Sequence, residues 1–306
     1  MKRNPAALRR LSTERTNPAS ANLDTKSALA IASIINREDA RVSRAVKHAL
    51  PQIAKAIDLI AAALSHGGRL IYVGTGTSGR IAALDAAECP PTFDTDPGLV
   101  QFIIAGGPKA LGAAIEADED SRTLGRKEMS RRKPRKHDVV VGVAASGRTP
   151  FTVAALEYAR AHGAKTVAVT CNRNSQLEKA AYVAIIAEVG PEVIAGSTRM
   201  KAGTAQKMIL NMLTTGAMTR LGYVYGNLMV NVHLKNEKLA ERGVAILEKA
   251  AGVRRKQARE LLVAAGNQVP VALVMAKSGV TAARAEAAMK ESRGHVRKAI
   301  ALARVS

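Results

Sequence analysis

Five short, continuous apolar runs alternate with helical segments between residues 70 and 188, and this alternation limits the possible folds more than any other feature. Runs this continuous are typical of strands that are buried on both faces of a parallel sheet. The alternation predicts an α/β fold: a doubly wound, mostly parallel sheet flanked by helices, with its ligand crevice at the carboxyl ends of the strands. The expected strands are Leu70–Val73, Leu99–Ala105, Asp138–Ala145, Lys165–Thr170 and Tyr182–Glu188, and the helices between them are Arg80–Glu88, Lys109–Met129 and Pro150–His162.

The segments outside this alternation indicate an arm and a second domain. Residues 1–25 are polar and rich in turn formers, so we expect an extended arm that is ordered only where it docks. A helical pattern over residues 200–221 follows the last apolar run, and beyond about residue 235 the pattern is helical only. We therefore expect a domain of residues 1–239, with the sheet and the arm, and a small all-helical domain of residues 240–306.

Composition favours a cytoplasmic globular protein. The hydrophobic fraction of 47% supports a sizeable core, yet no run of about 20 uncharged apolar residues is present to span a membrane. The basic N-terminus lacks the apolar core and cleavage site of a secretory signal. Cys89 and Cys171 lie far apart without a C-x-x-C or histidine partner, which argues against a disulfide framework and a structural zinc site.

The net charge of +21 is strongly basic, with clusters at Arg131–Lys136, Arg254–Lys256 and Arg293–Lys298. Such a field attracts polyanions, and it also draws in phosphorylated small molecules. No helix-turn-helix or RNA-binding signature accompanies the charge. We favour a solvated basic surface and expect no specific nucleic-acid partner.

The loop "GTGTSGR" after the first apolar run has the G-x-G-x-x-G spacing of a dinucleotide-binding turn at Gly74, Gly76 and Gly79. A dinucleotide site also needs an acidic residue at the end of the next strand, and the nearest acidic residues precede that strand instead. A triphosphate loop needs a hydroxyl for magnesium where Ile81 stands. Both nucleotide interpretations therefore fail.

What remains is a turn dense in hydrogen-bond donors at the positive end of a helix, which suits an anion or sugar hydroxyls. An ordinary tight turn between strand and helix is the alternative. The candidate binding residues of this first loop are Thr75, Gly76, Thr77 and Ser78.

Two further loops have the same character. The second, Ala144–Phe151, has Pro150 in the first turn of its helix, and the third, Gly196–Lys207, gathers basic residues at a helix start. Three such loops on one α/β scaffold favour a phosphorylated small molecule as ligand. The candidate binding residues are Ser146, Gly147, Arg148 and Thr149 in the second loop and Arg199 and Lys201 in the third.

Two groups of carboxylates are candidates for acid–base work. Glu88 is expected at the end of its helix, before Pro90–Pro91, and among alanines. The helix dipole and the apolar surroundings both disfavour an ionised carboxyl there, as a general acid requires, although a solvent-facing glutamate is the alternative. In the acidic run Glu116–Asp120, only one carboxylate could point into the crevice, and the pattern does not choose which.

Helix geometry limits how these groups share a substrate. Glu88 lies ten residues beyond Ser78, roughly 15 Å along a helix. Either the second loop holds the phosphate while the first holds the sugar, which we favour, or a neighbouring subunit completes the site. The six histidines show no ligand spacing, so we expect no metal site.

The ordered set of motifs "GTGTSGR", "LDAAECPPTF", "EDS", "VVVGVAASGRTPF", "GSTRMKAGTAQK" and "GNLMVNV", preceded by "TERTNPAS", resembles the N-acetylmuramic acid 6-phosphate etherase family. That family belongs to the sugar isomerase (SIS) fold group, and the chain is also similar to the glucokinase regulatory protein. The resemblance runs from about Leu11 to the end of the helical tail. Two features depart from the family: Thr75 stands where alanine is common, and the strong basicity is not a family property.

The resemblance implies cleavage of the D-lactyl ether of N-acetylmuramic acid 6-phosphate, a phosphorylated amino sugar, in cell-wall recycling. It implies Glu88 as proton donor to the leaving lactate and Glu119, through "EDS", as the base that removes a proton. It also implies a homodimer with the site near the subunit interface, and no metal or redox cofactor. The alternatives are a non-catalytic sugar-phosphate-sensing regulator and an aldose–ketose isomerase of the same fold.

Overall fold

The computed structural model describes residues 11–304 except residues 116–117, 233 and 235–236. The chain divides into two compact units. We call Met1–Ala86 with Gly98–Thr214 the sheet unit, and Ala87–Pro97 with Thr215–Ser306 the helical unit. The domain boundary expected between residues 239 and 240 stays a prediction.

The sheet is five-stranded and parallel throughout, in the order β2-β1-β3-β4-β5. Each of the five apolar runs forms a strand, so the predicted α/β fold is confirmed. The strand order reverses between β1 and β3, which makes their carboxyl ends the topological switch point where α/β proteins bind ligands. The strands are β1 (Leu70–Gly74), β2 (Val100–Ile104), β3 (Val139–Val143), β4 (Lys165–Thr170) and β5 (Val183–Ile186).

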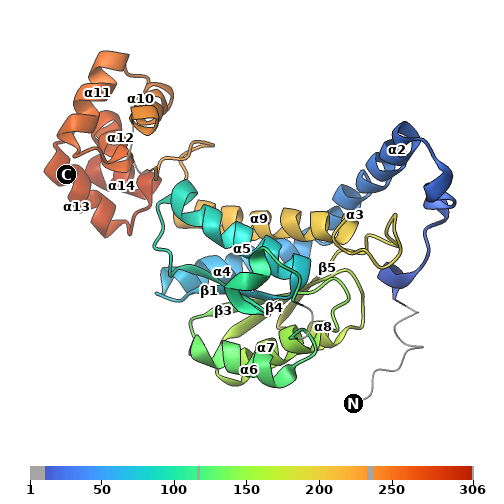
Figure 1. The fold of residues 1–306 in the computed structure, drawn as a ribbon. Coiled ribbons are helices and arrows are strands. Elements are labelled where there is room, and N and C mark those ends of the chain that lie inside the picture. The colour runs from blue at the N-terminus through green and yellow to red at the C-terminus, as the bar shows by residue number, and fades with distance from the viewer. Residues whose placement is uncertain (1–10, 116–117, 233, 235–236, 305–306) are drawn as a thin grey trace. The chain divides into compact units, whose positions relative to one another are not determined.

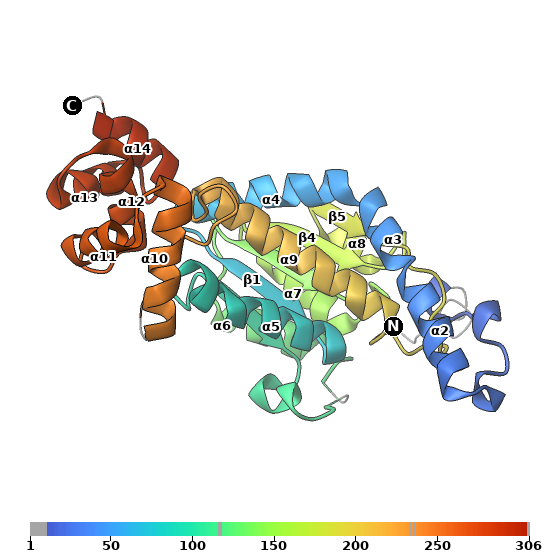
Figure 2. The same ribbon diagram turned by 90° about the horizontal axis from the view of Figure 1, so that it is seen from above.

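Helices cover both faces of the sheet (Figure 1). One face carries α4 (Leu50–Ser65), α5 (Gly76–Phe93) and α9 (Lys201–Leu221), and Figure 2 shows α9 lying between the other two. The opposite face carries α6 (Arg122–Arg131) and α7 (Pro150–Ala161). The core beneath α7 consists of fully buried side chains from helix and strands, among them Ile71, Val140, Phe151 and Leu156.

The N-terminal arm docks on the sheet unit, as expected for residues 11–25. It forms three short 3-10 turns, η1 (Ser12–Glu14), η2 (Pro18–Ser20) and η3 (Leu23–Thr25), which lead into α2 (Ala28–Asp39) and α3 (Val42–His48). Ser20 donates a hydrogen bond from Oγ to the carbonyl of Val193, at 2.7 Å. The arm thus pairs with the segment that follows β5.

Two expected helix boundaries were wrong. The helix expected over Lys109–Met129 is instead a 3-10 turn, η4 (Gly107–Leu111), and a separate α6 that begins after the cap Ser121, so the described acidic residues lie in the connection between them. Pro90–Pro91 does not end α5, which continues to Phe93. In α5, each proline lacks a backbone N–H donor, but this does not prevent a final helical turn. In the other segment, Gly112 directly follows the 3-10 turn, where the expected helix is interrupted.

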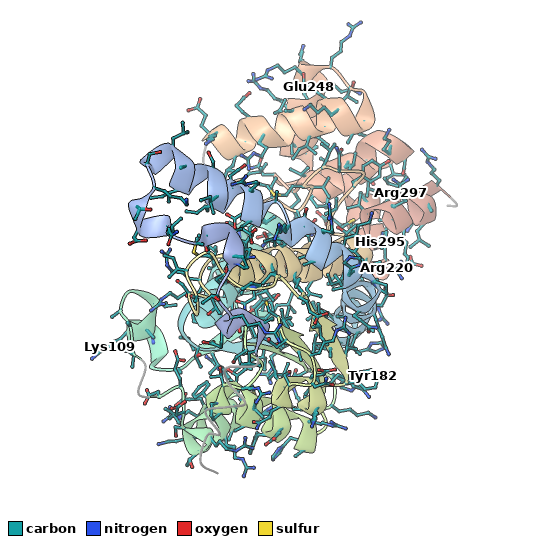
Figure 3. All side chains as sticks on the ribbon, turned by 90° about the vertical axis from the view of Figure 1, so that its right-hand side faces the viewer. Lys109, Tyr182, Arg220, Glu248, His295 and Arg297 are labelled. Atoms are coloured by element: carbon teal, nitrogen blue, oxygen red, sulfur yellow. The ribbon has the colours of Figure 1, made fainter. Side chains whose placement is uncertain are left out.

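The helical unit has a core of its own, with fully buried Leu247, Val269, Leu273 and Val296. Helix α12 contacts each of the four others, and Arg297 of α14, labelled in Figure 3, lies over the ring of Tyr225 with 4.9 Å to its centroid. The helices are α10 (Glu237–Ala251), α11 (Arg255–Ala264), α12 (Val269–Ser278), α13 (Ala282–Glu291) and α14 (Val296–Arg304).

No single helix in the described part of the chain is long and apolar enough to cross a membrane. The bent pair formed by α11 and α12 passes that test together, by length and composition only.

A buried ion pair joins α2 to the start of α9. The ammonium of Lys201 lies 2.6 Å from Oε2 of Glu38, and the two side chains are 1% and 3% exposed. Asn17 of the arm donates to the same oxygen at 2.8 Å. Burial acts to raise the pKa of Glu38, but the hydrogen bonds from Lys201 and Asn17 and the nearby positive charges outweigh it and leave the pKa below the ordinary 4.5.

We expect Lys201→Met to lower the free energy of unfolding by about 3 kcal/mol, because it removes the buried cation from Oε2 of Glu38 and leaves only the exposed Arg41, 2.9 Å from Oε1, to balance the charge. The double variant Glu38→Gln/Lys201→Met should recover most of that loss, since neither charge remains. Urea denaturation of the three proteins measures both effects. A double variant as unstable as Lys201→Met would contradict the assigned role of the pair.

Candidate active site

The first two loops flank the topological switch point. The first follows β1 and opens α5, and the second follows β3 and opens α7. Since β1 and β3 are paired from Leu70↔Val139 to Gly74↔Val143, their carboxyl ends are adjacent. The fold therefore places the two loops side by side.

The glycines of the first loop serve close packing. A Cβ at Gly79 would lie 2.6 Å from Ile104 of β2, so only glycine lets α5 approach the sheet here. Gly76 begins α5 with a φ of +49°, in the left-handed region. Thr75 is buried, whereas Thr77 and Ser78 are half-buried at the positive end of the helix.

The second loop is a tight turn beneath the N-terminus of α7. Gly147 has a φ of +65°, and a Cβ there would lie 2.5 Å from Oγ of Ser175. The backbone amide of Arg148 donates to Oγ of Ser146 at 3.2 Å, and Thr149 is the cap residue of the twelve-residue α7. Backbone amides and hydroxyls at the start of a helix of this length suit an anion.

Glu119 connects the first two loops. One carboxylate oxygen lies 3.1 Å from the position that a Cβ on Gly76 would occupy. Its backbone carbonyl accepts a hydrogen bond from the amide of Phe151, at 3.1 Å, in the first turn of α7. Glu116, the first residue of this acidic run, lies outside the described residues.

The third loop reaches the first through α9. A Cβ on Gly203 would lie 3.6 Å from the side chains of both Thr77 and Ile81. Arg199, in the third loop, is exposed. Lys201 was expected to bind the ligand, but its ammonium is buried against Glu38.

The surroundings expected for Glu88 were wrong in two respects. Glu88 lies within α5, five residues before its end at Phe93, and its side chain is exposed. Leu84, which is 54% exposed, and Ala87 are exposed on the same helix. The carboxyl therefore lies neither at the helix end nor in apolar surroundings.

Asp85 is a buried carboxylate that the sequence analysis missed. It accepts hydrogen bonds from the hydroxyl of Tyr72 at 2.8 Å, from Asn211 at 2.7 Å and from Thr214 at 3.2 Å. Burial raises its pKa, although these hydrogen bonds and the charge of Lys207 act to lower it. Asp85 thereby joins α5 to β1 and α9, and nothing in an isolated sequence distinguishes such a carboxylate from an exposed one.

No three histidine, cysteine, aspartate or glutamate side chains gather as possible metal ligands among the described residues. His48, His66, His137 and His162 are exposed and His295 is half-buried, whereas His233 lies outside the described residues. The three loops and Glu119 offer amides, hydroxyls and one carboxylate to a ligand.

We expect Gly147→Ala to distort the second loop, because the new methyl group would meet Ser175 and Thr170 in a backbone conformation that already disfavours alanine. Gly107→Ala is the matched control, since Gly107 has a φ of +64° and open space around it. Urea denaturation should show a loss of about 1 kcal/mol for Gly107→Ala and at least twice that for Gly147→Ala. Equal losses would show that the packing against Ser175 is unimportant.

The chain matches two family models. The model described as "Glucokinase regulatory protein N-terminal SIS domain" matches residues 52–160, and the one described as "SIS domain" matches residues 128–216. A phosphoheptose isomerase from Neisseria gonorrhoeae has a similar structure, with a TM-score of 0.50 and 18% identity, covering 63% of this chain and 100% of that one. At this identity the likeness shows the fold alone.

Curated relatives match over nearly the full length. The N-acetylmuramic acid 6-phosphate etherase of Klebsiella aerogenes is 48% identical over 293 residues, which cover 96% of this chain and 98% of the relative. The N-acetylmuramic acid 6-phosphate etherase 1 of Bacillus licheniformis is 47% identical over 292 residues, covering 95% and 96%. The resemblance in the motifs is thus confirmed across the whole chain, which belongs to the N-acetylmuramic acid 6-phosphate etherase family.

Proposed function

We propose that this chain cleaves the D-lactyl ether of N-acetylmuramic acid 6-phosphate through Glu119 and Glu88, releasing D-lactate and N-acetylglucosamine 6-phosphate in the recycling of cell-wall amino sugars. The activity follows from family membership, since relatives of 47–49% identity over nearly the whole chain are etherases. It is a carbon–oxygen lyase reaction. The roles of individual residues are our inference from the site.

The single observation that carries these roles is the placement of Glu119 between the first two loops. Its carboxylate lies beside Gly76, and its carbonyl accepts from Phe151 at the start of α7. A sugar whose phosphate lies on the second loop would have its carbon chain beside this carboxylate. We therefore assign the phosphate to Ser146, Gly147, Arg148 and Thr149, and the sugar hydroxyls to Thr75, Gly76, Thr77 and Ser78.

The third loop contributes Arg199, which is exposed at the same edge and complements the anionic substrate. Lys201 does not contact the substrate directly in this proposal, because its ammonium is paired with Glu38. The overall charge of +21 raises the local concentration of an anionic sugar phosphate.

The chemistry requires only acid–base groups. In the ring-opened sugar, the C1 aldehyde acidifies the proton on C2, and the carboxylate of Glu119 removes it. The electron pair forms a C2–C3 double bond as the C3–O bond to lactate breaks, and Glu88 donates a proton to the leaving oxygen. Water then adds at C3 and a proton returns to C2, so that substrate and water balance the two products.

We propose that the Glu88 which acts with Glu119 belongs to a second copy of the chain. Glu88 lies twelve residues beyond Gly76 on α5, about 18 Å along the helix axis. The atoms that the two glutamates must reach, C2 and the oxygen on C3, are separated by only two bonds. A symmetric homodimer in which α5 of one copy faces the loops of the other meets this requirement.

The proposal also covers the compartment, the cofactors and the domain boundaries. A phosphorylated sugar is charged and does not cross a membrane unaided, which supports a cytoplasmic reaction without a membrane anchor. Acid–base groups suffice for the steps above, so we propose no metal or redox cofactor. We retain residues 1–239 as the catalytic domain and residues 240–306 as the small helical domain.

The competing functions share the binding site and differ in the product. A sugar-phosphate-sensing regulator would bind the substrate without cleaving it, and an aldose–ketose isomerase would perform the same enolisation without releasing lactate. Incubation with N-acetylmuramic acid 6-phosphate and an enzymatic assay for D-lactate separates the three. Tight binding without lactate release would overturn the etherase proposal.

We expect Glu88→Gln and Glu119→Gln each to lower kcat by about a hundredfold or more, because each removes a proton-transfer group. Binding of N-acetylglucosamine 6-phosphate, measured by calorimetry, should persist in both variants. Asp120→Asn, adjacent to Glu119 and exposed, is the matched control and should retain activity. Near-normal turnover in either glutamine variant would contradict its assigned role.

Mixing the two inactive variants tests the shared site. In a mixed dimer of Glu88→Gln and Glu119→Gln subunits, one of the two sites carries both intact glutamates. Random exchange of equal amounts should therefore restore about a quarter of wild-type activity. Absence of any recovery, with subunit exchange shown by mass spectrometry, would place both glutamates of one site on the same chain.

A further inference from the structure

The segment Ser12–Thr13 of the N-terminal arm contacts the side chain of Asn172, far away in the sequence. Both the amide and the hydroxyl of Ser12 donate to Oδ1 of Asn172, at 3.0 and 2.9 Å. On the other side of the amide group, Nδ2 lies 3.3 Å from the hydroxyl of Thr13. Thr13 is completely buried, so this segment is fixed against the body of the sheet unit.

Asn172 extends this contact to the second loop. Its Nδ2 also donates to the carbonyl of Ala145, at 3.0 Å, one residue before Ser146. The same carbonyl accepts from the amide of Cys171 at 3.0 Å and from the hydroxyl of Thr170 at 3.2 Å. Three donors thus converge on one backbone oxygen, and the donor from Asn172 is linked directly to the arm through Ser12 and Thr13.

The arm also contacts the segment that leads to the third loop. The amide of Gly196 donates to the carbonyl of Thr13 at 3.3 Å, and a carboxylate oxygen of Glu14 lies 3.5 Å from the Cβ position of Gly196. Further along, Asn17 donates to the carbonyl of Pro191 at 3.2 Å, and Ser20 donates to that of Val193. The arm therefore bridges the segments that follow β4 and β5.

We propose that Ser12 and Thr13 are positioning residues for the phosphate-binding loop, acting through Asn172 on the carbonyl of Ala145. A buried side-chain amide with its oxygen and nitrogen both engaged has one orientation only, and the arm sets it. Holding the carbonyl of Ala145 fixes the direction in which the following amides and the hydroxyl of Ser146 point. This inference rests on the proposed assignment of the substrate phosphate to the second loop.

The role predicts a particular kinetic signature. Phosphate binding is remote from the reacting carbons, so loosening the loop should raise KM and leave kcat nearly unchanged. The double variant Ser12→Ala/Thr13→Val removes both hydroxyls that face Asn172 without changing charge. We expect it to raise KM by about fivefold, the range for one lost buried hydrogen bond.

The control variants separate this role from docking of the arm in general. Ser20→Ala removes an arm hydroxyl that binds Val193 and does not touch Asn172, and its KM should stay within about twofold of wild type. Asn172→Ala should raise KM at least as much as the double variant does. Combined with Asn172→Ala, the double substitution should add no further change, because its effect passes through Asn172.

The experiment is steady-state release of D-lactate by each full-length variant, with the dissociation constant for N-acetylglucosamine 6-phosphate and for unphosphorylated N-acetylglucosamine from calorimetry. The dissociation constant of the phosphorylated sugar alone should rise with KM. An unchanged KM in Ser12→Ala/Thr13→Val, an equal rise in Ser20→Ala, or additive effects with Asn172→Ala would each overturn the inference.

A thermal melt of each variant detects misfolding, and the double variant keeps the inference testable if Asn172→Ala fails to fold. Failure of the proposed function is distinguishable, since the wild-type protein would then release no lactate. In that case the calorimetric dissociation constants still test the positioning role.

Discussion

Buried charged side chains hold the start of α9 in place, and the positions of α2, the arm and the third loop depend on them. Glu192 is completely buried, and its carboxylate accepts hydrogen bonds from the backbone amides of Lys201 and Ala202, both at 2.9 Å. The ammonium of Lys201 forms an ion pair with Glu38. Burial raises the pKa of Glu192, although these amides and Lys201 act to lower it. Burial, assisted by Glu192, also raises the pKa of Cys171 to about 12, so this thiol is no nucleophile at neutral pH. One cluster thus anchors α2, the arm and the third loop together.

The sheet could be predicted because its central strands are buried along nearly their whole length and their sequences are mostly apolar, as in Val139–Val143. The connection between β2 and β3 could not, since a run of charged residues such as "EADEDS" is compatible with a helix face or an irregular segment. The continuation of α5 through Pro90–Pro91 could not be predicted from the sequence either. Local rules treat a proline pair as a helix end, but α5 continues for two residues beyond it, to Phe93.

The arrangement of the loops around the candidate site could be predicted in part, whereas the roles of its residues stay predictions. The first two loops follow from glycine and hydroxyl residues at strand ends, and the strand order brings them together. The choice of Glu119 within its acidic run came from the family resemblance, and the contact with Gly76 gives it a physical reason. The roles of Lys201, Asn172 and the arm depend on pairings across about 160 residues, such as that of Ser12 with Asn172, and no local pattern encodes them.

In the proposed mechanism, the exposure of Glu88 links catalysis to assembly of two copies. A general acid must keep its proton until the leaving group needs it, and exclusion of water from its surroundings favours that. Exposed Leu84 and Ala87 lie within one helical turn of Glu88, and a second copy that covers them would remove water from the carboxyl as well. In the proposed dimer, association would supply both the exclusion of water from Glu88 and the second glutamate of the shared site. On this proposal, a monomer with the same fold lacks both.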